Sequence, residues 1–341
     1  MTVKVLVTGG CGFIGSHFVR LLLRQFSDVE LSNLDLLTYA GNPANVSDVA
    51  PDPRYRFVQG DIADRGAVDE AIGDGVDVIV NFAAESHVDR SILESDAFLR
   101  TDIIGTHVLL EAARRHGVSR FLQVSTDEVY GDVRHGASRE DATLAPRSPY
   151  AASKAGGDLQ VLAYHATYGL STLITRGSNT YGPYQYPEKL IPLFVTNLIS
   201  DQPVPLYGDG LQIRDWLHVE DHTAGIFHVL RHGSPGEIYN LGGGNPRSNR
   251  EITERLLAYT GRAFDTHVRH VEERPGHDRR YSLDCAKAQA LGWRPRIEFE
   301  GGLRDTVQWY REHENWWKPL KSGEFLAYYE KQYAQRGAYT L

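Results

Sequence analysis

A glycine-rich loop directly after the first strand-like run constrains the fold of this chain more than any other feature. Val3–Val7 is a short apolar run, and Thr8–Gly15 follows it with the sequence TGGCGFIG. The first glycine permits a tight turn, the second lets the backbone approach a pyrophosphate, and the third allows close packing of helix on strand. The helix that starts near Phe13 offers free N–H groups to an anion. The pattern therefore predicts a strand, a loop and a helix that bind a dinucleotide.

An acidic residue stands where the ribose of such a cofactor is expected. Asp35 ends the second strand-like run and comes 20 residues after Gly15, which is the spacing of a ribose-binding carboxylate. Leu36 and Leu37 follow it, and no nearby arginine is available for a 2′-phosphate. The sequence therefore favours NAD over NADP. Asp61, after the third strand, either flanks the adenine or belongs to an ordinary turn.

Strand-like and helix-like runs alternate through the first half of the chain, which is typical of parallel βαβ units. After Arg176 the pattern loosens and prolines become frequent. We expect an α/β fold, a Rossmann-type doubly wound parallel sheet with a smaller C-terminal substrate-binding domain. The predicted strands are Val3–Val7, Leu31–Leu34, Arg56–Gln59, Val76–Phe82, Phe121–Val124 and Leu173–Thr175. The aromatic residues from Trp309 onward are expected to pack in the core or at a subunit contact.

Composition excludes several classes of protein. The 341 residues suggest two domains, and 36 Lys and Arg against 44 Asp and Glu give a net charge of −8. That balance argues against nucleic acid and against a membrane surface as partners. No apolar run approaches the roughly 20 residues that span a bilayer. Two cysteines, Cys11 and Cys285, make no disulfide framework, so we expect a cytoplasmic protein.

Tyr150 and Lys154 lie one helical turn apart, so a phenol and an ammonium share one helix face. A tyrosine that acts as a base near pH 7 must have its pKa lowered by roughly three units. An ammonium about 4 Å away supplies about that much at an effective dielectric constant of 20. A positively charged nicotinamide ring would add to this effect. The pair therefore predicts a general base.

Long stretches of the chain resemble the extended short-chain dehydrogenase/reductase family and, within it, the dehydratases that act on dTDP-glucose. They read TGGCGFIGS, LTYAGN, AAESHVDRS, STDEVYG, SPYAASKA, YGPYQYPEKLIPLF, QIRDWLHVEDH and RPGHDRRY. The resemblance implies tightly bound NAD and dTDP-glucose as substrate. It implies a NAD-binding domain over residues 1–177, to which a segment near 210–232 returns, and a nucleotide-sugar-binding domain mainly over 178–330.

Two adjacent acids, Asp127 and Glu128, follow the fifth predicted strand, and the resemblance makes this Thr-Asp-Glu run the mark of a dehydratase. Removing water from a hexose needs a carboxyl that donates a proton and a carboxylate that accepts one. In a continuing strand the two side chains would point to opposite faces. For both to serve one substrate, the extended conformation must break at about Thr126. The alternative is two solvated acids in a strand-end loop.

The resemblance implies a reaction in three stages. Tyr150, aided by Thr126, takes the proton of the C4 hydroxyl while a hydride passes from C4 to NAD. Glu128 then removes the C5 proton and Asp127 protonates the departing C6 hydroxyl. The hydride finally returns to C6 and a proton to C5, which gives dTDP-4-keto-6-deoxyglucose and regenerates NAD. A related epimerase or decarboxylase, and a non-catalytic NAD-binding regulator, remain as alternatives.

Carried over residue by residue, the resemblance assigns three sets of side chains. The catalytic set is Thr126, Asp127, Glu128, Tyr150 and Lys154. The cofactor-binding set is Gly9, Gly12, Phe13, Ile14, Gly15, Asp35, Thr38, Asp61, Ile62, Ala83, Ala84, Ser86, Thr101, Tyr150, Lys154 and Thr180. The substrate-binding set is Ser86, Thr126, Asn179, Lys189, Leu190, Pro205, Tyr207, Arg214, Asn249, Arg274, His277 and Tyr281.

The sequence departs from the pattern of this family at three positions. Cys11 stands where alanine is usual, and we expect it to be an inert packing residue. Asp102 and Thr180 stand where asparagines are common. His218 and His222 match neither zinc-binding spacing, so we expect a helix start there and no metal. The resemblance also implies a homodimer formed through helices around Phe98–Ala113 and Ser153–Tyr168.

Overall fold

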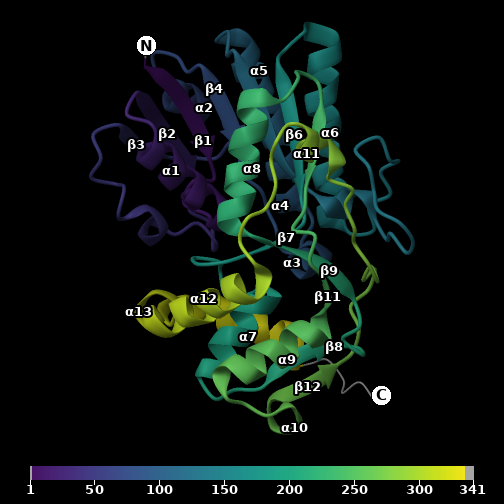
Figure 1. The fold of residues 1–341 in the computed structure, drawn as a ribbon. Coiled ribbons are helices and arrows are strands. Elements are labelled where there is room, and N and C mark those ends of the chain that lie inside the picture. Colours follow the sequence, from purple (N-terminus) through teal and green to yellow (C-terminus); the bar gives the residue numbers. More distant parts are fainter. Residues whose placement is uncertain (1, 335–341) are drawn as a thin grey trace.

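The computed structural model describes residues 2–334 and divides into two lobes, which Figure 1 shows one above the other. Within the described residues, seven parallel strands form one sheet in the order β10-β6-β5-β4-β1-β2-β3. The order reverses between β1 and β4, and in doubly wound sheets ligands bind at such a point, outside the carboxyl ends of the strands. The predicted fold class is confirmed. The strands are β1 (Val3–Thr8), β2 (Val29–Asp35), β3 (Tyr55–Gln59), β4 (Val78–Asn81), β5 (Arg120–Thr126), β6 (Thr172–Gly177) and β10 (Ile238–Leu241).

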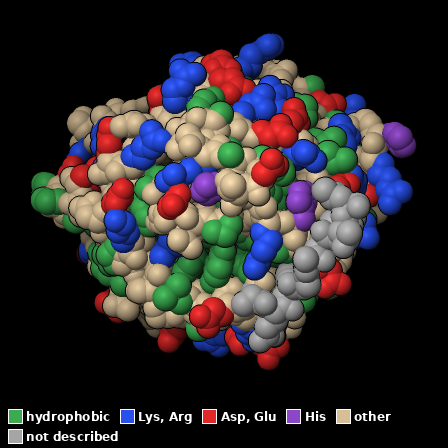
Figure 2. All heavy atoms as spheres, turned by 90° about the horizontal axis from the view of Figure 1, so that it is seen from below, with side chains coloured by type: hydrophobic (Ala, Val, Ile, Leu, Met, Phe, Trp, Pro, Cys, Tyr) green, Lys and Arg blue, Asp and Glu red, His purple; other side chains and the backbone are tan. Residues whose placement is uncertain are grey.

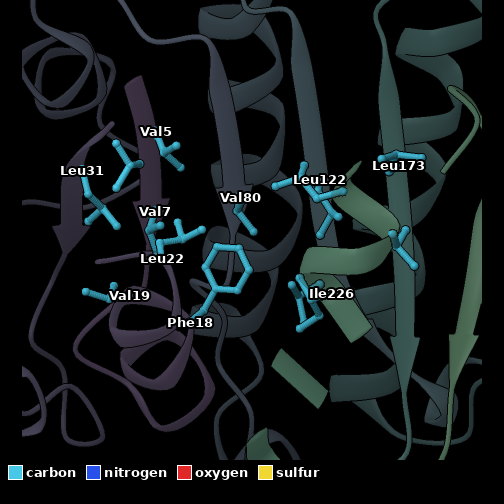
Figure 3. Close-up of a cluster of buried hydrophobic side chains, with 14 of the residues drawn as sticks. Val5, Val7, Phe18, Val19, Leu22, Leu31, Val80, Leu122, Leu173 and Ile226 are labelled. Carbon is cyan, nitrogen blue, oxygen red and sulfur yellow. The ribbon is translucent and has the colours of Figure 1, made fainter. Parts of the chain in front are cut away.

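Side chains alternate between the two faces of this sheet, and each face has its own helices. Val5 and Val7 pack under α1 and α8, whereas Leu6 packs under α2, α5 and α6 (Figure 1). Figure 3 shows the first of these clusters, with Phe18 of α1 pointing into it. Helices on both faces explain why most of these strands are apolar throughout rather than alternating. The helices are α1 (Phe13–Gln25), α2 (Arg65–Ile72), α5 (Thr106–Arg115), α6 (Pro149–Tyr168) and α8 (Val219–His232).

Short helical elements lie between the strands and the longer helices of this lobe. They are η1 (Pro43–Val46), α3 (Val88–Leu93), α4 (Asp96–Phe98), the π-helical segment η2 (Leu99–Gly105) and the 3₁₀ turn η3 (Asp127–Tyr130). Each predicted strand matches an observed one, with shifted ends. The strand β10 was not predicted, because Ile238–Leu241 is four residues long and lies far along the chain from β6, with which it pairs.

The second lobe has its own core, built on small sheets and helices. Trp309, Tyr310, Trp316 and Trp317 belong to this cluster, which confirms core packing for that part of the aromatic tail. Figure 2 shows basic and acidic side chains interspersed over the lower face of the molecule. Among residues 2–334, no helix is long and apolar enough to cross a membrane. The strands are β7 (Asn179–Tyr181), β8 (Val204–Tyr207), β9 (Ile213–His218), β11 (Pro246–Ser248) and β12 (Val268–Val271). The helices are α7 (Leu190–Ile199), α9 (Asn249–Thr260), α10 (Phe264–His267), α11 (Ala286–Ala290), α12 (Phe299–Glu312), α13 (Glu314–Trp317), η4 (Pro319–Lys321), α14 (Glu324–Tyr329) and η5 (Glu330–Ala334).

We expect Phe18→Ala to lower the free energy of unfolding by about 3–5 kcal/mol, because it leaves a cavity between α1 and the sheet. Phe18 is fully buried, and its ring centroid lies 5.1 Å from that of Phe82. Thermal and denaturant unfolding followed by circular dichroism measure the loss. Val3→Ala, at an exposed position of the same sheet, serves as the control and should cost less than about 1 kcal/mol. Equal losses in the two variants would contradict this account of the core.

Candidate active site

A cavity of about 400 Å³ lies where the carboxyl ends of the strands meet the second lobe. Residues of both lobes line it. All the residues that the sequence assigns to catalysis, cofactor binding or substrate binding lie on its wall. The fold thus brings together side chains that are separated by up to 272 positions, from Gly9 to Tyr281.

The glycine loop leaves no space for side chains. Gly9 has a φ of +69°, and a Cβ atom there would lie 2.7 Å from the backbone nitrogen of Ala83. A Cβ atom on Gly15 would lie 2.2 Å from the carbonyl oxygen of Gly9. Helix α1 begins at Phe13, and no side chain of the described residues caps its first turn. Free N–H groups at a helix start beside a bare backbone loop fit the pyrophosphate of NAD.

Asp35 lies at the end of β2 and is held by the backbone on both sides. Its Oδ2 accepts a hydrogen bond from the N–H of Cys11 at 2.9 Å, and its Oδ1 accepts one from that of Leu37 at 2.8 Å. Burial, and then the negative charge of Asp35, raise the pKa of the Cys11 thiol to about 12. A thiol in this state is protonated and unreactive at neutral pH. The geometry agrees with the expected packing role of Cys11.

The extended conformation ends at Thr126, as the sequence requires if both acids are to face one substrate. Strand β5 stops there, and Asp127–Tyr130 forms the 3₁₀ turn η3. The Thr126 hydroxyl accepts a hydrogen bond from the N–H of Glu128 at 3.2 Å and donates one to Asp127 Oδ1 at 3.3 Å. Asp127 is buried, Glu128 is half-buried, and both line the cavity. The predicted break is confirmed.

The environment of Asp127 favours the protonated form of its carboxyl group. Burial raises its pKa well above the usual range, and the neighbouring charge of Glu128 raises it further, while Arg214 opposes both effects. Its Oδ2 is buried and has no hydrogen-bond partner among the described residues. A neutral carboxyl with a free oxygen in a cavity can donate a proton to a leaving hydroxyl.

Tyr150 and Lys154 lie in the first turns of α6, so the predicted helix is confirmed. The Lys154 ammonium donates a hydrogen bond to the carbonyl of Val124 at 2.9 Å. In the protein alone, burial raises the pKa of Tyr150 well above 10, and the charges of Glu128 and then Asp102 add to this effect. The sequence argument counted the ammonium and a nicotinamide cation but not the buried acids, because it had no means of locating them. A cation beside the phenol would oppose this rise in pKa.

On the substrate side of the cavity, hydrogen-bond acceptors and an aromatic ring contact the basic side chains. Arg274 donates to Asp89 Oδ1 at 3.4 Å, and the Tyr207 hydroxyl donates to Asp89 Oδ2 at 2.9 Å. Arg214 lies 4.1 Å from the ring centroid of Tyr281. The remaining cation, Lys189, donates to the carbonyl of Ser86, and burial lowers the pKa of this lysine. Lys189, Arg214 and Arg274 together suit a diphosphate.

The cavity wall also contains residues that the sequence did not assign, among them Glu85, Asp89, His222 and Tyr333. Burial raises the pKa of Glu85 to about 7 and lowers that of His222 to about 4. His222 Nδ1 lies 2.8 Å from the hydroxyl of Thr180. Glu85 and Asp89 were within reach of sequence analysis, since they stand in the stretch AAESHVDRS. Nothing in the spacing of His222 or Tyr333 indicates that they reach this cavity.

Comparison with known proteins agrees with this geometry. Residues 6–306 match the family described as GDP-mannose 4,6 dehydratase. The dTDP-glucose 4,6-dehydratase of Streptomyces niveus is 53% identical over 324 residues, which cover 94% of this chain and 96% of that protein. The same-named enzyme of Neisseria meningitidis is 46% identical over 345 residues, covering 94% and 97%.

Solved structures give the same result. The crystal structure of the dTDP-glucose 4,6-dehydratase DesIV of Streptomyces venezuelae, with NAD bound, has a TM-score of 0.91 and 54% identity, and the match covers 94% of this chain and 100% of that one. The UDP-glucose 4-epimerase of Thermus thermophilus with NAD has a TM-score of 0.84 and 32% identity, covering 91% and 99%. Because sequence and structure both match over nearly the full length, this chain belongs to the GDP-mannose 4,6 dehydratase family of extended short-chain dehydrogenases/reductases, together with the dTDP-glucose 4,6-dehydratases.

Proposed function

We propose that this protein is a NAD-dependent hydro-lyase that converts dTDP-glucose into dTDP-4-keto-6-deoxyglucose. The observation that carries the proposal is the 3₁₀ turn after β5. It directs a protonated acid, Asp127, and its neighbour Glu128 into the cavity that Tyr150 also lines. Relatives named dTDP-glucose 4,6-dehydratase reach 54% identity, against 32% for the epimerase structure.

The chain's own residues hold and move the protons of this reaction. Tyr150 accepts the proton of the C4 hydroxyl, with Lys154 stabilising the phenolate and Thr126 hydrogen-bonded to the same oxygen. Oxidation at C4 acidifies the C5 proton, which Glu128 removes. Asp127 donates its proton to the C6 hydroxyl as that group leaves. NAD, when bound, would supply the redox chemistry by storing the hydride of C4 and giving it to C6, while a proton returns to C5.

Binding is divided between the two lobes in this proposal. Residues 1–177, with the returning segment near 210–232, hold NAD through the glycine loop and Asp35. Residues 178–330 mainly hold the nucleotide sugar, with Lys189, Arg214 and Arg274 on its diphosphate. The other side chains assigned to cofactor or substrate binding contact the remaining parts of these two ligands. The two unpaired cysteines of the chain and its net charge of −8 support a cytoplasmic location.

We also propose a homodimer, supported by an exposed apolar surface on α3, η2 and α6. These elements lie side by side, and six large apolar side chains on them are 39% to 57% exposed. Exposed apolar area of this kind marks interaction sites on proteins. The residues that form this surface are Ile92, Leu93, Leu99, Ile104, Leu159 and Tyr168.

The proposed activity is tested by incubating the protein separately with dTDP-glucose, UDP-glucose and GDP-mannose. We expect mass spectrometry to show loss of one water from dTDP-glucose. A new isomer of unchanged mass, separated from the substrate by chromatography, would identify an epimerase, and loss of carbon dioxide from a nucleotide-linked uronic acid, added as a fourth substrate, would identify a decarboxylase. A non-catalytic regulator would leave all these substrates unchanged.

Glu128→Gln should separate oxidation from elimination, because the amide cannot remove the C5 proton. We expect dehydrated product to form about 10²–10⁴-fold more slowly, the usual contribution of a general base. Reduced nicotinamide should still appear at 340 nm when dTDP-glucose is added. The exposed Glu30→Gln serves as the control and should turn over normally. Normal turnover of the Glu128 variant would remove this residue from the mechanism.

Leu159→Glu should split the dimer, since it places a charge in the middle of the exposed apolar surface. We expect light scattering to give about twice 38.2 kDa for the unaltered protein and a value near 38.2 kDa for the variant. Val3→Glu, at an exposed position of β1, is the matched control and should remain dimeric. A monomeric unaltered protein at micromolar concentration would refute the dimer.

A further inference from the structure

The last segment that the structure describes, α14 and η5, contacts both lobes where they meet. The Tyr328 hydroxyl lies 3.2 Å from Nδ1 of His87, and the Tyr328 ring centroid lies 4.4 Å from the Arg90 guanidinium. These contacts join α14 to the lobe of the seven-stranded sheet. The carbonyl of Tyr333 accepts a hydrogen bond from Arg269 of β12 at 3.0 Å, which joins η5 to the second lobe. The segment therefore spans the boundary at which the cavity lies.

Tyr333 of this segment belongs to an aromatic part of the cavity wall. Its ring centroid lies 6.0 Å from that of Tyr207, which in turn lies 5.9 Å from that of His277. All three rings line the cavity. The family resemblance assigns Tyr207 and His277 to the substrate, whereas Tyr333 lies beyond residue 330, where the predicted nucleotide-sugar domain ends. The end of the chain thus adds a third ring beside two that are assigned to the substrate.

Hydrogen bonds connect these rings to a basic side chain that is proposed to hold the diphosphate. Gln332, the neighbour of Tyr333, donates to the Tyr207 hydroxyl at 2.8 Å. That hydroxyl donates to one oxygen of Asp89, and the other oxygen accepts a hydrogen bond from Arg274. Tyr207 is therefore separated from a diphosphate-binding cation by a single carboxylate.

The order of these groups along the cavity indicates which part of the substrate reaches Tyr333. The sugar reacts at Tyr150, and the Lys189 ammonium lies 6.0 Å from the centroid of that ring. In a nucleotide sugar, the diphosphate joins the sugar to the nucleoside. If the diphosphate lies on Lys189 and Arg274, the nucleoside lies on the side of Arg274 that is away from the sugar. Tyr207 and Tyr333 line that side.

We propose that Tyr333 is a further substrate-binding residue, whose ring packs against the base of the nucleotide sugar. Aromatic side chains stack on bases because every base presents a flat π face. The inference rests on the proposed function, from which it takes the order of sugar, diphosphate and nucleoside. It extends the substrate site to the last residues that the structure describes.

The alternative role for Tyr333 is packing in the core of the second lobe. Tyr333 is 4% exposed, belongs to the apolar cluster of that lobe, and has its ring centroid 4.8 Å from that of Tyr329. A residue that only packs there would contribute to stability and not to the affinity for a ligand. Measuring both quantities in one variant separates the two roles.

The test is Tyr333→Leu in the NAD-loaded protein, which removes the ring and keeps an apolar side chain. Isothermal titration calorimetry with dTDP, UDP and GDP identifies the nucleotide that binds most tightly. We expect its Kd to rise about tenfold in this variant, the size of a lost stacking contact. Tyr333→Phe keeps the ring and should bind nearly as tightly as the unaltered protein. Leu326→Ala, at an exposed position of α14, controls for disturbance of the segment and should leave the Kd unchanged.

Inorganic pyrophosphate is the second ligand, because it carries the charges of a diphosphate but no base. We expect Tyr333→Leu to bind pyrophosphate as the unaltered protein does. An equal loss of affinity for both ligands would show that the ring acts on Arg274 through Tyr207 and Asp89, and the inference would be wrong. A lower Tm with unchanged nucleotide affinity would assign Tyr333 to the core alone and would also overturn it.

Turnover separates this inference from the proposed function. We expect the KM for dTDP-glucose to rise in Tyr333→Leu while kcat changes little, since the ring would contact the base and not the reacting sugar. If dTDP-glucose is dehydrated and the nucleotide Kd is unchanged, the inference fails and the proposed function stands. If dTDP-glucose is not dehydrated but the variant binds the nucleotide more weakly, the proposed function fails and the role of Tyr333 stands. If none of the three nucleotides binds, both are wrong.

Discussion

The end of strand β5 at Thr126 is the constraint on which the candidate site depends. A strand sends successive side chains to opposite faces, so a strand continued by two residues would direct either Asp127 or Glu128 into an apolar helix–sheet interface. The 3₁₀ turn removes that conflict within two residues, and the Thr126 hydroxyl caps it. Both acids consequently face the cavity that holds Tyr150 and the basic side chains.

Burial shifts the pKa values of the acidic and basic groups in the cavity in opposite directions. Asp127 is buried and close to another acid, and both effects raise its pKa. Lys189 is half-buried, and its pKa falls because desolvation disfavours the ammonium. The phenol of Tyr150 stays neutral in the protein alone. The proposed ligands carry charges that complement these groups. The cationic nicotinamide ring would lie beside the phenol, and the anionic diphosphate beside the basic side chains.

Much of this arrangement was predictable from the sequence, since local rules decide it. The glycine loop, Asp35 and the strand alternation predict the sheet and its ligand-binding edge. The Tyr150–Lys154 spacing predicts a helix face, and the period of a strand alone requires the break at Thr126. Of the residues that sequence analysis missed, His222 and Tyr333 reach the cavity only through long-range packing.

The short strand β10 illustrates why other features of the structure could not be predicted from the sequence. Its four residues carry almost no periodic signal and are recognisable as a strand only when β6 lies beside them. The pKa of Tyr150 likewise cannot be predicted from the local sequence. It depends on acidic residues of η2 and η3, which are separate from α6 in the sequence. The spacing of residues predicts the secondary structure of one segment, but not which segments contact each other in the fold.

The placement of β10 and α8 has a consequence for the synthesis of this protein. Both complete the sheet lobe, yet the ribosome makes them only after β7, α7, β8 and β9 of the other lobe. Until residue 241 has emerged, β6 is an unpaired edge and the face that α8 covers is bare. Exposed edges of this kind invite pairing with other chains. The nascent chain must therefore hold an incomplete sheet while a second lobe is translated, and its first 177 residues alone are a poor unit for separate expression.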